Sequence, residues 1–228
     1  MKRLFLLTIA FMIGISVSAQ KIFFPTKTGT KLYYQMYDKK GKISNKIVYT
    51  IKEVKGSGDN LDITYQAEML DDKDKVLYLD EVAIRQRGDK MFCDMSNFLN
   101  KAAFPQQEGE KPTLEITGNN LEIPVVPVPS MTLPDAFISI AMKMGIINLK
   151  MTANVTNRKV EAVESVTVEG GTFNAFKISS EVNSSILGIK VNTFGTDWYA
   201  YNIGIVKTVS LDKKGNVASS LELVKIEE

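Results

Sequence analysis

Apolar and polar residues alternate along most of this chain, with the period of two that is typical of a strand with one buried face. The clearest case runs from Leu61 to Met69, where every second residue is apolar or aromatic and the others are polar. Similar short segments, separated by polar turns, cover residues 30–38, 46–54, 76–85, 90–95 and 217–226. This spacing predicts an antiparallel meander.

Residues 165–211 show the most regular pattern, and we expect them to form the core of the meander. Val166 and Val168 alternate with polar residues, and Gly170-Gly171 allows the positive φ angles of a sharp turn. The only tryptophan, Trp198, lies in a later strand of this stretch. It is either a core anchor or a platform for a ligand, and the anchor is the commoner role of a buried aromatic residue.

The pattern changes between residues 124 and 145. Three prolines within 124–129 favour an extended, polyproline-like chain. The segment Thr132-Leu133-Pro134-Asp135 resembles a capping box. Apolar residues then follow at helical spacing until Gly145: Leu133, Phe137, Ile140, Ala141 and Met144. The sequence therefore predicts one helix over 133–144, which either completes the core or acts as a lid over a ligand.

Several shorter predictions complete the fold. Phe23-Phe24-Pro25 is expected to form a short first strand, and residues 96–112 a polar loop with a short helical turn. Residues 114–116 and 121–123 flank Gly118-Asn119-Asn120 and are expected to pair as a hairpin. Residues 146–162 form a strand long enough to bend or bulge. The predicted fold is all-β: an antiparallel curved sandwich or partly open barrel with one short helix packed on it.

The first 19 residues have the features of a signal peptide. A charged start, Met1-Lys2-Arg3, precedes an apolar run, and Val17-Ser18-Ala19 supplies the small residues of a cleavage site. We expect cleavage after Ala19 and a single exported β domain of residues 20–228, located in the periplasm or secreted. No later apolar run is long enough for a transmembrane helix.

A resemblance emerges in the last third of the chain. The segment Val166–Ile178, with its Gly-Gly-Thr-Phe turn, followed by Trp198–Lys207, is similar to the C-terminal half of exported TapB-like proteins, a family of uncharacterised envelope proteins. The chain departs from that pattern at Glu169-Gly170 and Tyr201-Asn202, where the family carries Pro-Ala and Pro-Gly. The resemblance implies an antiparallel β fold in the envelope, and it implies no catalytic residue.

Composition excludes several functions. The chain has no histidine, so Ser-His-Asp and Cys-His catalysis and most zinc sites are excluded. Without Lys2 and Arg3 the charge of +2 falls to zero, which argues against electrostatic binding of nucleic acid. The single cysteine, Cys93, cannot form an internal disulfide, and we expect it to be buried on a strand or, less readily, to pair with another molecule.

Carboxylates leave two alternatives open. Paired carboxylates in one cleft could make the protein a glycosidase, but solvated turn charges would look the same in the sequence. Asp71, Asp72 and Asp74 either bind calcium or form a solvated turn, and they lack the glycine and glutamate of an EF-hand. We therefore predict no catalytic residue, no metal and no cofactor.

The leading hypothesis is a non-enzymatic envelope protein that binds an apolar or amphipathic ligand, or an envelope partner, in the barrel interior. The alternative is a structural or assembly factor that acts through the 124–134 strap or a sheet edge and takes no small-molecule ligand. Methionine side chains adapt to irregular apolar ligands. The candidate ligand contacts are Phe137, Met142, Met144, Trp198 and Tyr199.

Overall fold

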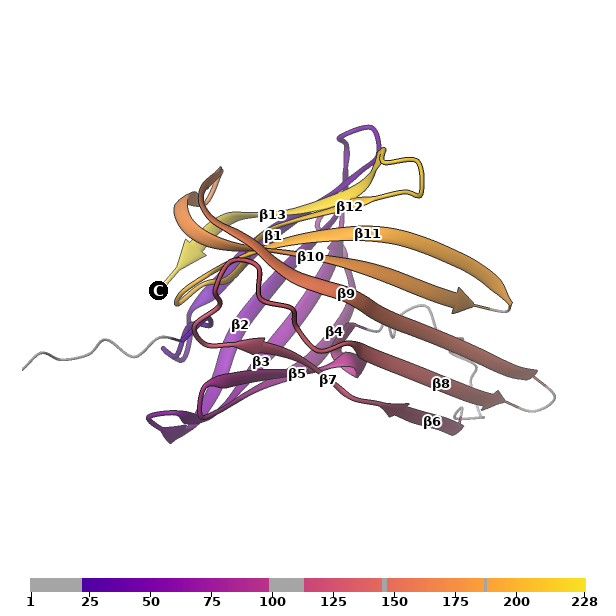
Figure 1. Ribbon diagram of the computed structural model, residues 1–228, viewed down its shortest axis with the longest axis horizontal. Helices are drawn as coiled ribbons and strands as arrows, with labels where there is room; N and C mark the ends of the chain where they lie inside the picture. Colours follow the sequence, from indigo (N-terminus) through magenta and orange to yellow (C-terminus); the bar gives the residue numbers. More distant parts are fainter. Residues whose placement is uncertain (1–21, 99–112, 145–146, 187) are drawn as a thin grey trace, which may run out of the picture.

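The computed structural model describes residues 22–98, 113–144, 147–186 and 188–228, which form one antiparallel sheet that curls into a nearly closed barrel (Figure 1). The elements are β1 (Lys31–Asp38), β2 (Ile43–Ser57), β3 (Asn60–Asp71), β4 (Val76–Arg87), β5 (Lys90–Asp94), the 3-10 turn η1 (Met95–Phe98), β6 (Thr113–Gly118), β7 (Asn120–Pro124), β8 (Ala136–Met144), β9 (Ile147–Val168), β10 (Gly171–Ile186), β11 (Ile189–Ala200), β12 (Gly204–Leu211) and β13 (Val217–Glu227). The predicted all-β class is confirmed.

Strand order follows the sequence over two long runs, as the alternating pattern predicts. Strands β9 to β13 lie side by side in chain order, β13 pairs with β1, and β1 to β5 continue the sheet. The predicted core meander is confirmed, because β9 and β10 pair through the Gly170-Gly171 turn and β11 to β13 follow. The last strands therefore bring the C-terminal half of the chain against its beginning.

The barrel closes where β6 and β7 meet. These two strands occupy opposite ends of the sheet order, yet only Asn119 separates them in the sequence. The side chain of Asn119 accepts a hydrogen bond from Phe137 N at 2.7 Å and donates one to Asp135 O at 3.1 Å. The predicted hairpin of residues 114–116 and 121–123 is therefore wrong: both strands exist, but β6 pairs with β8 and β7 with β5.

The predicted helix over 133–144 is also wrong, because the structure places strand β8 there. Its buried residues are Ala136, Ile138, Ile140 and Met142, which alternate strictly. This segment is so rich in apolar residues that it satisfies both a helical and a strand period, and pairing with β6 and β9 decides in favour of the strand. Among the described residues, no helix is long or apolar enough to cross a membrane.

Strand β9 bulges, as its length predicts. Asn157 adopts a left-handed φ of 52°, and the register against β10 shifts between Ser179 and Glu181. The strap runs beside β9 at this point, and the backbone hydrogen bond from Val160 N to Met131 O holds it there. Leu133 of the strap is buried in the core. The predicted short helical turn corresponds to η1, whereas residues 99–112 lie outside the described residues.

Aromatic side chains fill one end of the barrel. Phe23 is fully buried and lies 4.9 Å, centroid to centroid, from the stacked ring of Tyr201. The backbone of this segment is irregular, so the predicted strand at Phe23-Phe24-Pro25 is wrong. A hydrogen bond from Asn202 N to Ile22 O ties it to the turn after β11. The segment therefore acts as a plug that places Phe24 against the barrel interior.

A second, smaller core lies where the β9–β10 turn covers neighbouring strands. Val166, Val168 and Ala175 pack there with Val206 and Leu223, among others. Gly170 donates its N–H to Leu223 O at 3.0 Å, and a Cβ on Gly170 would lie 3.0 Å from that oxygen. A side chain at this position would therefore crowd the close approach of the turn to β13.

Three hairpin turns share one construction. They begin at Asp38, Asp71 and Asp212, and each Oδ1 accepts backbone N–H groups from the residues two and four positions later, at 2.8 to 3.0 Å. These hydrogen bonds lower the pKa of all three carboxyl groups. The left-handed fourth residues are Gly41, Asp74 and Gly215. The cluster Asp71, Asp72 and Asp74 is therefore part of a turn, in which Asp74 pairs with Lys46.

Candidate functional site

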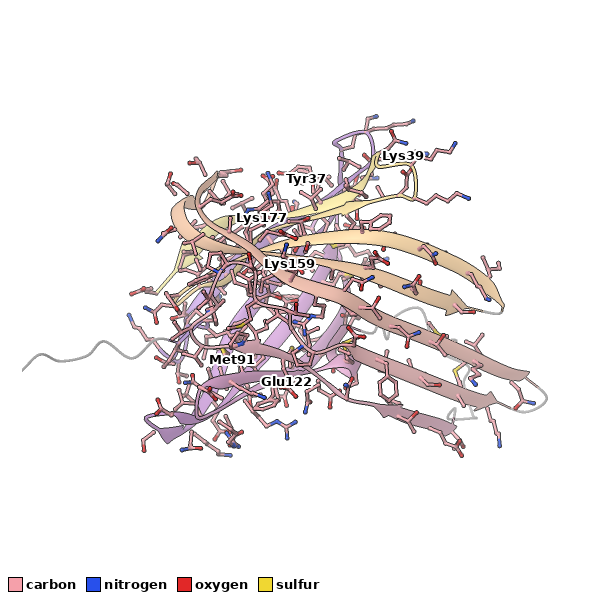
Figure 2. All side chains as sticks on the ribbon, in the orientation of Figure 1. Tyr37, Lys39, Met91, Glu122, Lys159 and Lys177 are labelled. Carbon is pink, nitrogen blue, oxygen red and sulfur yellow. The ribbon has the colours of Figure 1, made fainter. Side chains whose placement is uncertain are left out.

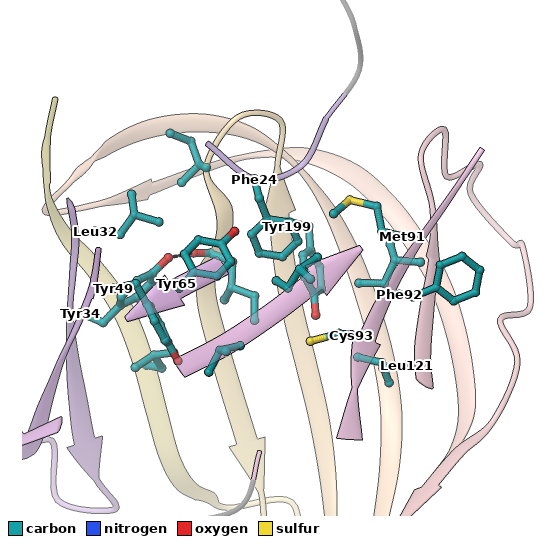
Figure 3. A pocket seen from close by; sticks show the side chains of 16 residues that line it. Phe24, Leu32, Tyr34, Tyr49, Tyr65, Met91, Phe92, Cys93, Leu121 and Tyr199 are labelled. Atoms are coloured by element: carbon teal, nitrogen blue, oxygen red, sulfur yellow. Dashed lines mark hydrogen bonds between the residues drawn. The ribbon is translucent and has the colours of Figure 1, made fainter. Parts of the chain in front are cut away.

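A cavity of about 100 Å³ lies inside the barrel and is partly open to solvent (Figure 3). Strands β1 to β5 and β7 contribute to its wall, together with the opposite wall of β11 to β13 and the plug residue Phe24. The lining consists of Phe24, Leu32, Tyr34, Tyr49, Tyr65, Val82, Ile84, Met91, Phe92, Cys93, Leu121, Ile123, Tyr199, Ile203, Ile205 and Leu221. None of these side chains carries a formal charge at neutral pH.

Tyrosines form one wall of this cavity. The rings of Tyr34, Tyr49 and Tyr65 meet in successive edge contacts, with centroids 5.7 and 6.1 Å apart. Phe24 extends the row, 5.9 Å from Tyr65. Such contacts fix ring orientation and add about 0.5–1.5 kcal/mol per pair beyond the buried area. The wall is therefore rigid on the side where a ligand would lie.

The hydroxyl groups on this wall differ in their partners. Tyr34 Oη donates to Ile205 O at 2.7 Å, on β12, which only β13 separates from β1. Tyr65 is only 3% exposed, and among the described residues its Oη has no hydrogen-bond partner. Burial raises the pKa of Tyr65 well above its ordinary value, so the hydroxyl stays protonated at neutral pH. Tyr65 thus keeps a neutral hydroxyl that is buried within the apolar wall without a partner.

Tyr199 on β11 joins the cavity to a buried polar group. Burial raises the pKa of Tyr199, and Asp197 on the same strand adds to the effect. Burial also raises the pKa of Asp197, opposed by a hydrogen bond from Thr208 at 2.6 Å and by Arg158. Tyr199 is the one among these groups that lines the cavity.

Arg158 closes the barrel seam. This side chain is 2% exposed and donates to Pro134 O at 2.6 Å and to Glu122 O at 2.9 Å. It therefore links β9, the strap and β7, where no ladder of backbone hydrogen bonds joins β7 to β8 in the described residues. Burial lowers its pKa, while nearby acidic groups oppose that shift.

Cys93 lies on the cavity wall, opposite Ile84 of β4 and Leu121 of β7 in the sheet register. It is half-buried and forms no disulfide. The predicted position on a strand is confirmed, whereas the thiol is half-buried and not fully buried as expected. Because it is the only thiol in the chain, it also offers a natural reporter of cavity occupancy.

The structure brings one of the five predicted ligand contacts to the cavity. Tyr199 lines it. Met142 is 1% exposed and packs within the sheet wall, and Phe137 is 45% exposed on the opposite face of β8. Met144 ends β8, and its side chain is outside the described part of the structure.

Trp198 is a structural anchor on the outer side of β11. Its Nε1 donates to Glu164 Oε1 at 2.7 Å, and Lys177 of β10 lies 5.4 Å from the ring centroid. Figure 2 shows Lys177 near Lys159 on this side of the barrel. The ring also packs against the smaller core. These contacts support the core-anchor interpretation over the ligand platform.

The cavity residues that sequence reasoning missed come mostly from the N-terminal half. Tyr65 had a usable signal, because it occupies a core position in the clearest one-sided strand and carries a hydroxyl that needs a partner. Phe24 and Met91 had no such signal, since nothing local distinguishes them from other core residues. Their place in the site depends on barrel closure.

Other surfaces offer less for ligand chemistry. An outer groove of about 580 Å³ over β1 to β3 and β13 contains Lys46 and Asp74, but these charges pair with each other. In the described residues no group of three acidic, cysteine or histidine side chains could hold a metal ion. Asp197 has a carboxyl group with a raised pKa, and in the described ranges no second carboxyl group with a raised pKa lies beside it. The geometry therefore gives no support to a glycosidase pair.

A family model described as DUF3108-like matches residues 27–223, nearly the whole barrel. The chain belongs to the DUF3108-like family. A search among curated proteins finds no match. The family assignment is compatible with the expected resemblance to uncharacterised envelope proteins, but the TapB-like relationship itself stays a prediction.

Two solved structures share the fold. One is described as an exported protein with a YmcC-like fold from Bacteroides fragilis, with TM-score 0.76 and 20% identity over 91% of this chain and 99% of that chain. The other is described as a lipoprotein from Parabacteroides distasonis, with TM-score 0.75 and 19% identity over 90% of this chain and 98% of that chain. At this level of identity the likeness establishes the fold and no residue role.

Proposed function

We propose that this protein is an exported, non-enzymatic binding protein that takes the apolar part of a small or amphipathic ligand into the barrel cavity. The observation that carries the proposal is the cavity lining, which combines aromatic and aliphatic side chains with few polar groups. Ligand sites typically have this composition, with a small number of polar groups that fix orientation.

Cavity size limits what can enter. Its volume of about 100 Å³ is below the roughly 300–1,000 Å³ of ordinary ligand pockets. It is nearer to apolar cavities of about 150 Å³ that bind benzene. We therefore infer that a single ring or a short chain segment enters, while any larger or polar part of the ligand stays outside the barrel.

A filled-cavity variant tests this proposal. Val82 lines the cavity on β4 and is half-buried, so Val82→Trp places an indole in the space that a ligand would use. Leu79→Trp adds the same ring on the opposite, exposed face of the same strand. Calorimetric titration with ethylbenzene should show binding to the wild type and to Leu79→Trp, and none to Val82→Trp. Equal binding to all three proteins would refute the cavity as the site.

Export is proposed on two grounds. The first 19 residues have the features of a signal peptide, although they lie outside the described residues. The two similar structures are described as an exported protein and a lipoprotein. We propose cleavage after Ala19, which leaves residues 20–228 as one exported domain. The intact mass of protein recovered from the periplasm should begin at Gln20, and a retained leader would contradict the proposal.

A surface role remains as the second candidate, because the strap exposes apolar side chains. Val126 and Val128 are 50% and 53% exposed, whereas Val125 and Leu133 of the same strap are buried. An assembly factor would use the exposed pair to contact an envelope protein. Val126→Ser with Val128→Ser should then abolish capture of that partner while ethylbenzene binding persists. Unchanged capture by the double variant would remove the strap from consideration.

A further inference from the structure

Two neighbouring hairpin turns at one end of the barrel carry a concentration of lysines. The β1–β2 turn and the β12–β13 turn adjoin because β1 pairs with β13, where Asp38 lies opposite Ser219. Figure 1 shows these turns side by side, in indigo and yellow, and Figure 2 shows Lys39 beside them. Their exposed lysines are Lys39, Lys40, Lys42, Lys213 and Lys214.

The charge of these two turns is unbalanced. None of the five lysines forms an ion pair within the described part of the chain. The acidic residues of the turns are Asp38 and Asp212, whose carboxylates accept backbone N–H groups of the turn itself. Five positive and two negative charges leave the two turns with a net charge of +3.

The third aspartate turn shows that turn geometry does not require this charge. Residues 71–75, between β3 and β4, have the same hydrogen bonds from backbone N–H groups to the first aspartate. This turn contains three aspartates and two lysines, so its net charge is −1, and Asp74 also pairs with Lys46. The same backbone construction accommodates either sign of charge. The lysine excess therefore belongs to the two adjoining turns.

Exposed apolar side chains border the lysines. Ile43 directly follows the β1–β2 turn, and Val217 directly follows the β12–β13 turn. Phe194 of β11 is also exposed and belongs to the same row, because it lies opposite Leu211, which lies opposite Val217. Residues directly opposite one another in a ladder point to the same face of the sheet. This end of the barrel thus combines cationic with apolar side chains.

The combination matches the surface of an anionic membrane. Lysines within a Debye length of anionic headgroups are attracted to them, and apolar side chains at the same level reach the boundary between headgroups and acyl chains. All five cations are lysines, which act as flexible point charges. Arginine is the residue that pairs bidentately with one carboxylate. The composition therefore favours a layer of many lipid phosphates over a single acidic site on a protein.

We propose that the β1–β2 and β12–β13 turns dock this protein onto a membrane surface that contains anionic phospholipids. The lysines approach the headgroups, and Ile43 and Val217 enter the headgroup layer beside them. The docking surface is separate from the barrel cavity, since no residue of either turn lines that cavity. The inference goes beyond the cavity function and does not depend on it.

Co-sedimentation of residues 20–228 with lipid vesicles tests the proposal. Vesicles of phosphatidylcholine with phosphatidylglycerol are anionic, and vesicles of phosphatidylcholine alone are neutral. We expect binding to the anionic vesicles to be stronger by about tenfold or more. The difference should shrink as added salt shortens the range of the attraction.

Two double variants with the same change in charge assign the contact. Lys213→Gln with Lys214→Gln alters the β12–β13 turn, and should weaken binding to anionic vesicles about tenfold or more, because each lysine near such a surface contributes roughly a fivefold factor. Lys73→Gln with Lys75→Gln alters the β3–β4 turn, and should weaken binding less than about twofold. All four side chains are exposed, so both variants should fold, which urea unfolding checks.

A third variant tests the apolar part of the contact. Ile43→Ser with Val217→Ser keeps every charge and removes the two apolar side chains that follow the turns. We expect it to bind anionic vesicles severalfold more weakly than the wild type. Binding equal to that of the wild type would overturn the proposed docking geometry, because the lysines would then act only as a diffuse charge.

The remaining outcomes are equally decisive. Equal wild-type binding to anionic and neutral vesicles, or no binding to either, would overturn the proposal and leave an acidic protein as the occupant of the lysine turns. Equal losses in the two lysine variants would also overturn it, because the charge of the whole protein would then explain the binding. None of these results bears on the cavity, which ethylbenzene tests separately.

Discussion

Two buried polar side chains in this barrel contrast sharply. Arg158 at the seam is 2% exposed and has two backbone acceptors, Pro134 O and Glu122 O. Tyr65 in the cavity wall is 3% exposed and has no partner in the described structure. The two side chains are about equally buried, but only Arg158 has hydrogen-bond partners for its buried polar atoms. Arg158 therefore stabilises the seam through its two acceptors, whereas the Tyr65 hydroxyl contributes no hydrogen bond to the fold.

The largest effect is expected at the seam. Arg158→Leu removes two charge-assisted hydrogen bonds and leaves both carbonyl oxygens in the strap and β7 without a donor. At about 1.5–3 kcal/mol for each bond to a charged group, we expect the free energy of unfolding to fall by about 3 kcal/mol or more. Urea denaturation measures the change. A loss below about 1 kcal/mol would mean that the barrel closes without this side chain.

The corresponding substitution in the cavity wall, Tyr65→Phe, should leave the free energy of unfolding nearly unchanged. Tyr65→Phe removes a hydroxyl that has no partner, and it preserves the ring. Because no hydrogen bond is lost, we expect the free energy of unfolding to stay within about 1 kcal/mol of the wild type, and to rise if it changes. The same urea titration provides the comparison. A loss as large as that of Arg158→Leu would show that Tyr65 has a structural partner.

Cys93 provides a reporter for occupancy of the cavity. Its thiol lines the space, so a bound ligand should slow its reaction with a small alkylating reagent. We expect ethylbenzene at saturating concentration to reduce the alkylation rate severalfold in Leu79→Trp, as in the wild type. In Val82→Trp the rate should not respond to ethylbenzene. A rate that is insensitive to ethylbenzene in the wild type would place the bound probe elsewhere.

The contribution of the buried Asp197 carboxyl to stability should depend on pH. Burial raises its folded-state pKa above the unfolded value of about 3.9. Its contribution to stability is therefore fully present below pH 3.9 and is lost as the pH rises through the folded-state pKa. Asp197→Asn keeps an acceptor for Thr208 and removes the ionisation. We expect the variant to be more stable than the wild type at pH 7 and to show a flatter dependence of unfolding free energy on pH.

The smallest effects should come from the three aspartate turns. The pKa values of Asp38, Asp71 and Asp212 are lowered by backbone hydrogen bonds, so their contribution is present above the unfolded pKa of about 3.9 and is lost as the pH falls through the folded-state values. Replacing each with asparagine keeps the Oδ1 acceptor. Thermal melts of the triple variant should differ from the wild type only slightly at pH 7, and should lose less stability on acidification to pH 3. Equal acid sensitivity would contradict this assignment.

The sequence predicted the strands well because most of them bury one face. Residues 61–67 show this, since the alternating residues of this part of β3 are those that the structure buries. The helix prediction was wrong at β8, because the apolar residues there fit both a helical and a strand period. The pairing of β6 with β7 was also wrong, because the partners of these strands lie far away in the chain. Local patterns carry strand propensity, but pairing across the seam depends on Asn119 and Arg158.

The residues of the candidate site were harder to predict from the sequence than the strands were. Of the five predicted ligand contacts, Tyr199 lines the cavity and its role stays a prediction, whereas Phe137 and Trp198 were chosen for apolar character and lie on other surfaces. Every element of the cavity wall contributes one to three side chains, and these converge only after closure. A satisfied and an unsatisfied hydroxyl are identical in sequence, so Tyr34 and Tyr65 are told apart only by the structure.

The most direct test of cavity binding is native mass spectrometry of protein purified from the periplasm without detergent. The account predicts extra mass on the wild type and on Leu79→Trp that organic solvent removes, and a bare mass for Val82→Trp. A bare mass for the wild type under these conditions, with no ethylbenzene binding in solution, would contradict the account and favour a role through the exposed strap.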